Sequence, residues 1–305
     1  MYNVEKFNPL VDFAFKKLFG VDENKDILMD LINAVVSEDD KVENIEIKNP
    51  YNPKLFKNDK LSILDIKAQC IKNKQWYNIE VQIMNQDCYG ARALYYWSKL
   101  YNSQLTAGIN YDNLYKTISI NFLNFNCLAN EDYYHNVYKL TNVVTKNKYS
   151  PDHLEIHFVE LKKYHETFSN TLDKWANFLV KAHKYDTENL PKELQIPSIQ
   201  KAVEVLERMH FTPEERDNYE AGLKWFRDEE MAIKTATNKG REIGMTEGKE
   251  IGMTEGKEIG MTEGKEIGFM DAKLKIALKM KQNGISTALI SETTGLSSNE
   301  INQLS

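Results

Sequence analysis

Residues 61–84 read LSILDIKAQCIKNKQWYNIEVQIM, and this stretch decides the fold. Two runs in which apolar and polar residues alternate, 61–70 and 76–84, flank a short polar segment. Alternation with a period of two is typical of strands in a sheet. We therefore expect two strands joined in a hairpin that turns at Asn73-Lys74.

This hairpin predicts a polar row on one face of the sheet. With the expected turn, Asp65 faces Gln82 and Lys67 faces Glu80. Neighbours across two strands lie ~5 Å apart and diagonal neighbours ~7–8 Å apart, so Asp65 and Glu80 can share a hard cation such as Mg²⁺. Such an ion can orient a water against a phosphodiester and offset charge on the leaving oxygen. The alternative is the solvated face of an antiparallel sheet, which shows the same alternation.

The segments around the hairpin predict a mixed sheet flanked by helices. Apolar spacing favours helices over 9–36, broken near Gly20, and over 89–108, whereas alternation favours strands over 43–48 and 116–124. The order α-β-β-β-α-β then defines an α/β core over residues 1–128. Residues 129–239 form a mainly helical region that completes the domain, with one more strand expected at 154–161.

A glycine-rich octad repeat follows in residues 240–270. The sequence EIGMTEGK occupies 242–249, 250–257 and 258–265. Eight residues rotate an α-helix by ~800°, so the stripe of Ile and Met turns by ~80° from one octad to the next. Each glycine costs ~1 kcal/mol relative to Ala in a helix interior. The repeat is therefore either a flexible linker or frayed helix, or a helix supported by self-association.

Residues 271–305 are expected to form a small helical tail. The expected breaks are Asn283-Gly284 and Thr294-Gly295, and the expected capping box joins Ser297 or Ser298 to Glu300. Two helices joined by a glycine-containing turn have the spacing of a helix-turn-helix. Helical hairpins that bind no DNA share this spacing, so both interpretations stay open.

Composition and missing motifs exclude several classes of protein. The 305 residues include 45 Asp and Glu against 39 Lys and Arg, a net charge of −6, which argues against a strongly basic nucleic-acid coat. Three scattered cysteines are too few for a thiolate metal site or a disulfide frame. No signal peptide and no run of ~18 apolar residues is visible, so we expect a cytoplasmic protein that does not enter a membrane. Phosphate-loop, GxGxxG and GxSxG motifs are missing, and HLEIH at 153–157 lacks the HExxH order of a zinc site.

An ordered set of motifs resembles the Rpn family, the recombination-promoting nucleases or transposases of the PD-(D/E)XK nuclease superfamily. The segments that carry the resemblance are DFAFKKLFG at 12–20, KLSILD at 60–65, YNIEVQ at 77–82, RALYYWSKLY at 92–101 with Gln104, Leu105, Gly108 and Tyr111, LDKW at 172–175, the octads, and TGLS at 294–297. No single motif is specific, but their order covers nearly the whole chain. The resemblance implies a restriction-endonuclease-like fold and Mg²⁺-dependent hydrolysis of DNA. It also implies a role in recombination, mobile elements or phage defence.

The resemblance assigns a role to each matching acid. Asp65 and Glu80 correspond to the motif acids that ligate Mg²⁺, with Mn²⁺ as the alternative ion. Gln82 stands where the superfamily usually has Lys, so it can position water or a phosphate oxygen but supplies no positive charge. Asp12 is a candidate third metal ligand, or simply an acid favoured by the dipole at a helix N-terminus.

The resemblance also implies contacts with DNA. Lys16, Arg92 and Gln104 are the candidates for holding the DNA backbone, and Arg92 is favoured for its fork of donors. Lys16 can instead be a solvated surface lysine. The expected partners are DNA and a second copy of the chain, most simply in a homodimer. The alternatives are a DNA- or protein-binding module whose metal site has lapsed, and an assembly protein that oligomerises through the octads.

Overall fold

The computed structural model describes residues 7–52, 62–63, 65–84, 88–106 and 108–304. They divide into two compact units, of which the first ends at Glu230 and the second begins at Met231, within the helix α6 (Pro213–Gln282). Among these residues no helix combines the length and hydropathy needed to cross a membrane.

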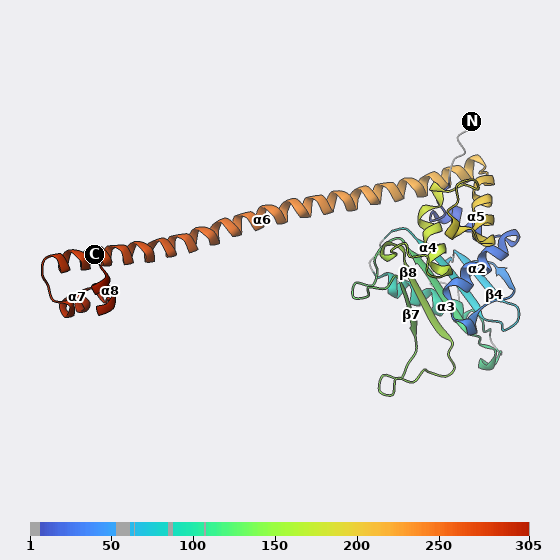
Figure 1. Ribbon diagram of the computed structural model, residues 1–305. Coiled ribbons are helices and arrows are strands. Elements are labelled where there is room, and N and C mark those ends of the chain that lie inside the picture. Colours follow the sequence, from blue (N-terminus) through green and yellow to red (C-terminus); the bar gives the residue numbers. More distant parts are fainter. Residues whose placement is uncertain (1–6, 53–61, 64, 85–87, 107, 305) are drawn as a thin grey trace. The chain divides into compact units, whose positions relative to one another are not determined.

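A six-stranded mixed sheet forms the centre of the first unit (Figure 1). Its order is β1-β4-β5-β6-β8-β7, with bounds β1 Ile45–Lys48, β4 Ile66–Cys70, β5 Trp76–Gln82, β6 Thr117–Leu123, β7 His135–Lys139 and β8 Leu154–Glu160. Strands β5, β6 and β8 run parallel, and the outer strands join antiparallel. The two-residue strands β2 (Tyr51–Asn52) and β3 (Ser62–Ile63) pair separately. The mixed α/β sheet predicted from the sequence is confirmed.

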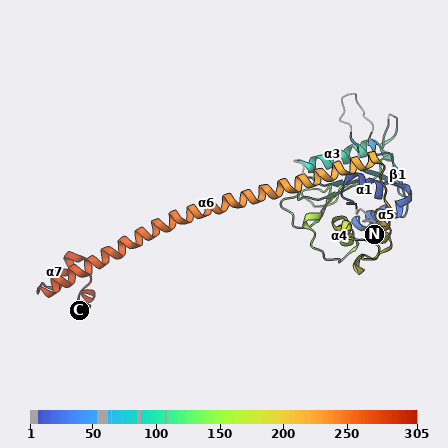
Figure 2. The ribbon, with the colours of Figure 1, turned by 90° about the horizontal axis from the view of Figure 1, so that it is seen from above.

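Helices cover both faces of this sheet. On one face α3 (Tyr89–Asn102) packs against β5, β6 and β8. The other face carries α1 (Asp12–Phe19) and α2 (Lys25–Val35), with α4 (Thr171–Lys181) and α5 (Pro197–Arg208) packed behind them. Figure 2 shows α3 on one side of the sheet and α4 and α5 on the other. Short 3₁₀ turns are η1 (Asp22–Asn24), η2 (Glu38–Asp40), η3 (Tyr111–Asn113), η4 (Leu161–Lys163), η5 (Ala182–Lys184) and η6 (Lys192–Leu194).

The main core forms between the sheet and α1, α2, α4 and α5. Every second residue of the central strands is apolar on this side, namely Tyr77, Ile79, Val81, Ile118, Ile120 and Phe122. Phe15 and Phe19 of α1 and Trp175 of α4 are fully buried against them. Burial of these large rings fixes α1 against the sheet, because each fully buried apolar side chain contributes ~1.5–3 kcal/mol.

The hairpin of β4 and β5 differs from the expected register by two residues. Lys67 lies opposite Asn78 and not opposite Glu80. This pairing centres the turn between residues 72 and 73, one position earlier than expected, and Lys74 lies in the left-handed region at φ 60°. A shift by an even number keeps every side chain on its face, so Asp65, Glu80 and Gln82 still share one face.

The sheet continues beyond residue 128, and the sequence analysis missed one of its strands. The expected strand at 154–161 is β8, but β7 was not foreseen. The β7 sequence HNVYK is mostly polar and only partly buried, as befits an edge strand, so it lacks the alternation used to find strands.

The octads are helical, because 240–270 lies within α6. In each octad the Thr hydroxyl donates to the carbonyl four residues earlier, at 2.9 Å for Thr246, Thr254 and Thr262. The side chains of this segment are exposed.

The tail ends the second unit with α7 (Thr287–Thr294) and α8 (Ser298–Gln303). Gly295 ends α7 at φ 69°, a conformation that favours glycine. The expected capping box between Ser297 and Glu300 is confirmed. A small apolar core joins the end of α6 to α7 and α8 through Ala277, Ile290, Leu296 and Ile301.

Candidate active site at the end of the central hairpin

Asp65 and Glu80 lie side by side where the hairpin of β4 and β5 opens. Asp65 occupies the bend before β4, and its backbone N–H donates to Glu80 Oε1 at 3.3 Å. The backbone N–H of Val81 donates to Asp65 Oδ2 at 2.9 Å. These two bonds bring together acids that the sequence predicted to share a face. The Asp65 side chain is 13% exposed and Glu80 is 2% exposed.

Burial and mutual repulsion raise the pKa of both carboxyls. Burial raises the pKa of Asp65 to about 7, the negative charge of Asp12 adds to this, and Lys16 opposes it. Burial also raises the pKa of Glu80 well above its usual range, with the charge of Asp65 as the next cause, whereas Arg92 opposes it. Two buried carboxylates that repel each other are stabilised by a cation.

Helix α1 contributes a lysine and a third acid to this site. The Lys16 ammonium lies 3.1 Å from Asp65 Oδ1 and 2.7 Å from Asp12 Oδ1. Burial opposes the charge on Lys16, but the carboxylates of Asp65 and Asp12 outweigh it and raise the pKa of the ammonium. Asp12 is therefore linked to Asp65 both through Lys16 and by a side-chain hydrogen bond of its own.

The donor set fits a divalent ion with few protein ligands. Within the described residues, no group of three or more His, Cys, Asp and Glu side chains is arranged to hold a metal ion. Asp65 and Glu80 alone provide two carboxylates, which is the common arrangement for Mg²⁺, an ion that retains several waters.

A cavity of about 410 Å³ opens beside the acid pair. It is lined by Leu10, Val11, Asp12, Phe13, Val81, Gln82, Ile83, Met84, Asn218, Gly222 and Trp225. Gln82 is the last residue of β5, so strand alternation places its side chain on the face of Glu80. Asp12 and Gln82 both line this cavity, whose volume can hold a phosphodiester group.

Arg92 approaches the acid pair from α3. Its guanidinium carbon lies 5.0 Å from the ring centre of Tyr96 and 5.9 Å from that of Tyr89. Its charge acts on Glu80, as the opposing effect on the Glu80 pKa indicates. The structure therefore brings Arg92 to the predicted site.

Gln104 does not join the other candidates. Its amide donates to Thr117 Oγ1 at 2.8 Å and to the Tyr115 carbonyl at 3.2 Å, and it accepts the Tyr115 N–H at 2.8 Å. Thr117 begins β6 and lies beside Trp76, the first residue of β5. Gln104 therefore holds the chain at the opposite end of the strands from Glu80.

The sequence analysis missed a row of buried polar residues on the site face. Asn78, Ser119 and Asn121 are inaccessible to solvent under α3. Tyr89 OH donates to Asn121 Oδ1 at 3.1 Å, and Asn121 donates to the His157 carbonyl at 3.0 Å. A signal was present, because a strand with Ile118 and its alternate neighbours on the core side must turn its polar residues to the other side.

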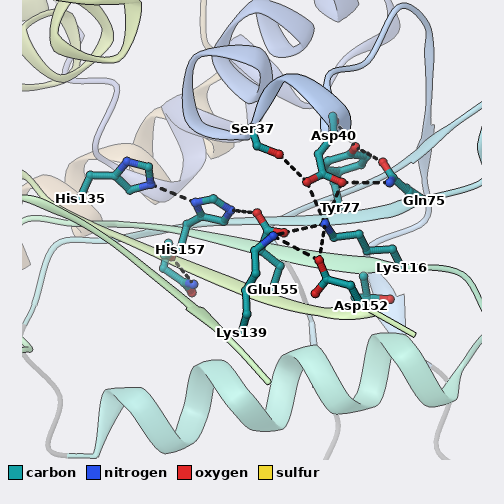
Figure 3. Close-up of polar contacts among 12 residues, drawn as sticks. Ser37, Asp40, Gln75, Tyr77, Lys116, His135, Lys139, Asp152, Glu155 and His157 are labelled. Atoms are coloured by element: carbon teal, nitrogen blue, oxygen red, sulfur yellow. Dashed lines mark hydrogen bonds and ion pairs between the residues drawn. The ribbon is translucent and has the colours of Figure 1, made fainter. Parts of the chain in front are cut away.

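A second buried polar cluster lies at the other end of the sheet (Figure 3). Lys116, directly before β6, pairs with Asp40 Oδ1 and with Glu155 Oε2, both at 2.7 Å. Glu155 Oε1 lies 2.7 Å from His157 Nε2, and His157 Nδ1 shares a hydrogen bond of 2.9 Å with His135 Nε2. The two histidines of HLEIH have different partners, since His157 contacts Glu155 and His135 whereas His153 contacts the Tyr101 hydroxyl.

This cluster sets the ionisation of its members. Burial lowers the pKa of His135 to about 4, and the neighbouring His157 adds to the shift. Burial opposes ionisation of Glu155, but hydrogen bonds from His157, Lys116 and Lys139 outweigh it and lower the pKa of Glu155. The cluster links β7 and β8 to η2 through charges held inside the fold.

Comparisons with known proteins gave two matches to family models. The family described as PD-(D/E)XK nuclease family transposase matches residues 9–236, well over half of the chain. The C-terminal HTH domain of the Rpn/YhgA-like nuclease family matches residues 271–305. Neither the curated proteins nor the solved structures gave a match. The first match includes Asp65, Glu80 and Gln82, and the second covers α7 and α8.

Proposed function

Because the chain belongs to the PD-(D/E)XK nuclease family transposases, we propose that it is a DNA endonuclease that uses a divalent metal ion. Membership of this family suggests a nuclease or a transposase-like function. The C-terminal HTH domain suggests that DNA is the partner. The observation that carries the finer proposal is the contact between Asp65 and Glu80 beside an open cavity.

Asp65 and Glu80 would hold Mg²⁺, with Mn²⁺ as the alternative ion. When bound, the ion supplies Lewis-acid stabilisation of the charge that develops on the phosphate. The contact between the two carboxylates supports this fit, and so do their raised pKa values, because added positive charge stabilises such a pair.

Gln82 and Arg92 are proposed to orient the attacking water, the phosphate and the DNA backbone. Gln82 lines the cavity, and a side-chain amide can donate to a phosphate oxygen or accept from the attacking water. Arg92 is the candidate contact to the DNA backbone from α3. In the reaction the water oxygen bonds to phosphorus and the bond to the leaving oxygen breaks. The water loses one proton to solvent, and the leaving oxygen gains one.

The C-terminal tail and the octads are proposed to serve DNA recruitment and self-association. We assign DNA recruitment to the tail 271–305, on the strength of its family match and the α7–Gly295–α8 geometry. Self-association as a homodimer is assigned to the octads, which expose a stripe of Ile and Met. A cytoplasmic role in recombination, mobile elements or phage defence accords with DNA as the substrate.

The test is cleavage of supercoiled plasmid by the purified protein with Mg²⁺, with Mn²⁺ and with EDTA. We expect metal-dependent nicking that falls by ~10²–10³-fold in Asp65→Ala and in Glu80→Ala, because each removes charge stabilisation at the reacting phosphate. Asp22→Ala, an exposed acid of η1, is the matched control and should cleave like wild type. Far-UV circular dichroism checks that the variants fold.

Two outcomes would contradict the proposal. Cleavage retained by both Asp65→Ala and Glu80→Ala would remove the assigned site. A wild-type protein that binds DNA but leaves plasmid intact with either ion would favour the lapsed binding module.

A further inference from the structure

The acid pair is flanked by cations from different elements. Lys67 of β4 lies on the same face, but its ammonium sits 5.0 Å from the ring centre of Trp76, at the far end of β5 from Glu80. Arg92 approaches Glu80 from α3 and stacks on Tyr96. The Lys16 ammonium lies 3.1 Å from Asp65 Oδ1 and thus contacts the acid pair directly from α1.

Lys16 is held in place by its own helix. Asp12 lies one turn earlier in α1, and its two oxygens are 2.7 and 2.9 Å from the Lys16 ammonium. Residues four apart on a helix face the same side, so the pair is a local feature of α1. The buried Phe15 and Phe19 fix this helix against the sheet, which directs Lys16 to Asp65.

The Lys16 ammonium stands between the acids and solvent. The Lys16 and Asp12 side chains are 36% and 58% exposed, whereas Asp65 is 13% exposed. Asp12 and Gln82 both line the cavity beside the acid pair. Lys16 contacts Asp12 of the cavity lining, so a phosphodiester group held in this cavity beside Asp12 would lie near the Lys16 ammonium.

Gln82, the last residue of β5, lines the cavity but carries no positive charge. An amide stabilises a developing negative charge less than an ammonium does, because charge-assisted hydrogen bonds are about twice as strong as neutral ones. A site that breaks a phosphodiester gains from a fixed cation at the phosphate. Among the described residues, Lys16 combines contact with Asp65 and exposure toward solvent.

We propose that Lys16 is the catalytic cation of this site and that its ammonium contacts an oxygen of the scissile phosphate. It supplies from α1 the positive charge that Gln82 does not supply from β5. Asp12 then anchors Lys16 and does not act as a metal ligand. The inference rests on the proposed nuclease function and adds a residue to it.

The experiment compares full-length Lys16→Met, Lys16→Arg and the double variant Lys16→Met/Gln82→Lys with wild type. Lys201→Met is the matched control: Lys201 of α5 pairs with Asp26 at 2.6 Å, with side-chain exposures of 38% and 55%. Plasmid cleavage is measured at saturating Mg²⁺, DNA affinity with Ca²⁺, and metal binding as the rise in Tm that Mg²⁺ causes. The last two measurements do not depend on turnover.

We expect Lys16→Met to lower kcat by ~10²–10³-fold while DNA affinity stays within about threefold, because the lost contact acts in the transition state. Lys16→Arg should retain cleavage within about tenfold of wild type, since it keeps the charge. The double variant should cleave at least about tenfold faster than Lys16→Met. Lys201→Met should match wild type, and Mg²⁺ should still stabilise Lys16→Met.

Several results would overturn the inference. Lys16→Met that cleaves like wild type while Asp65→Ala does not would remove Lys16 alone and leave the nuclease function standing. Loss of the Mg²⁺ effect on Tm in Lys16→Met would mean that Lys16 only arranges the carboxylates. Lys16→Arg as inactive as Lys16→Met, or a double variant without recovery, would show that the charge is not what matters. A wild type without cleavage would overturn both proposals.

Discussion

Asp65 gives the candidate active site a pH dependence whose sign follows from its raised pKa. Burial, with the charge of Asp12, raises its pKa to about 7. A divalent ion needs the carboxylate, so protons compete with the metal below that pH. We expect Mg²⁺ affinity to rise with pH between 5.5 and 8, by up to about tenfold per pH unit for each proton released on binding, because the pKa values of both Asp65 and Glu80 are raised. Isothermal titration calorimetry from pH 5.5 to 8 measures this.

The same shift has the opposite effect on the metal-free fold. Since the folded pKa of Asp65 lies above its unfolded value, its contribution to stability is present at low pH and is lost as pH rises through about 7. Asp65→Asn does not titrate at this position and should lose less stability than wild type as pH rises through about 7. Wild-type affinity that does not change between pH 5.5 and 7 would contradict the prediction.

The sequence predicted which acidic residues share a face of the sheet, but it did not predict which side chains contact them. Period-two alternation assigns Asp65, Glu80 and Gln82 to one face whatever even register the strands adopt. The contact between Lys16 and Asp65 was not predictable, because it depends on how α1 packs against a hairpin remote in sequence. Gln104 fits the family pattern but serves the start of β6.

At the scale of elements, the buried cluster makes the attachment of β7 to β8 sensitive to acid. The folded pKa of His135 is about 4, below its ordinary value of 6.5, so its contribution to stability is lost as pH falls from about 6.5 toward 4. The pKa of Glu155 is lowered as well, so its contribution is present above its ordinary pKa and is lost at lower pH still. Between pH 7 and 5, His135 therefore dominates within this cluster.

We expect His135→Gln to lose ~2 kcal/mol less free energy of unfolding than wild type between pH 7 and pH 5. Gln does not titrate and can still donate to His157 Nδ1. Urea unfolding at the two pH values measures the difference, in which contributions common to both proteins, including that of Asp65, cancel. His210→Gln, at an exposed position, is the control. Equal losses in wild type and His135→Gln would contradict the assignment.

The buried central strands were predicted correctly from the sequence, whereas the partly exposed edge strand β7 was not. β5 and β6 are central and apolar on the core side, so their alternation identified them. The edge strand β7 pairs through its backbone with a mostly polar sequence, which alternation cannot reveal. The hairpin register depended on the left-handed residue Lys74, a position that glycine or asparagine usually marks.

At the scale of the whole molecule, local signals located the parts of the C-terminal region. Gly295 and the box of Ser297 and Glu300 were predictable, because caps depend on neighbours in sequence. The helical state of the octads was not, since glycine opposes it and no sequence signal reports what stabilises the segment. A Cβ added at Gly244, Gly252 or Gly260 would meet no atom within 4 Å among the described residues.

That empty space allows a test of why the octads contain glycine. If the glycines serve only the single helix, replacing Gly244, Gly252 and Gly260 by Ala should stabilise the helix by ~1 kcal/mol for each change and have no other effect. If they let a second copy approach closely, as the proposed homodimer requires, the same change should raise monomer helicity but weaken association. We expect the second result: a smaller mass by light scattering, a stronger signal at 222 nm, and unchanged cleavage per protomer. An unchanged dimer would exclude a close contact at these glycines, because three added methyl groups cannot enter a close helix contact without disturbing it.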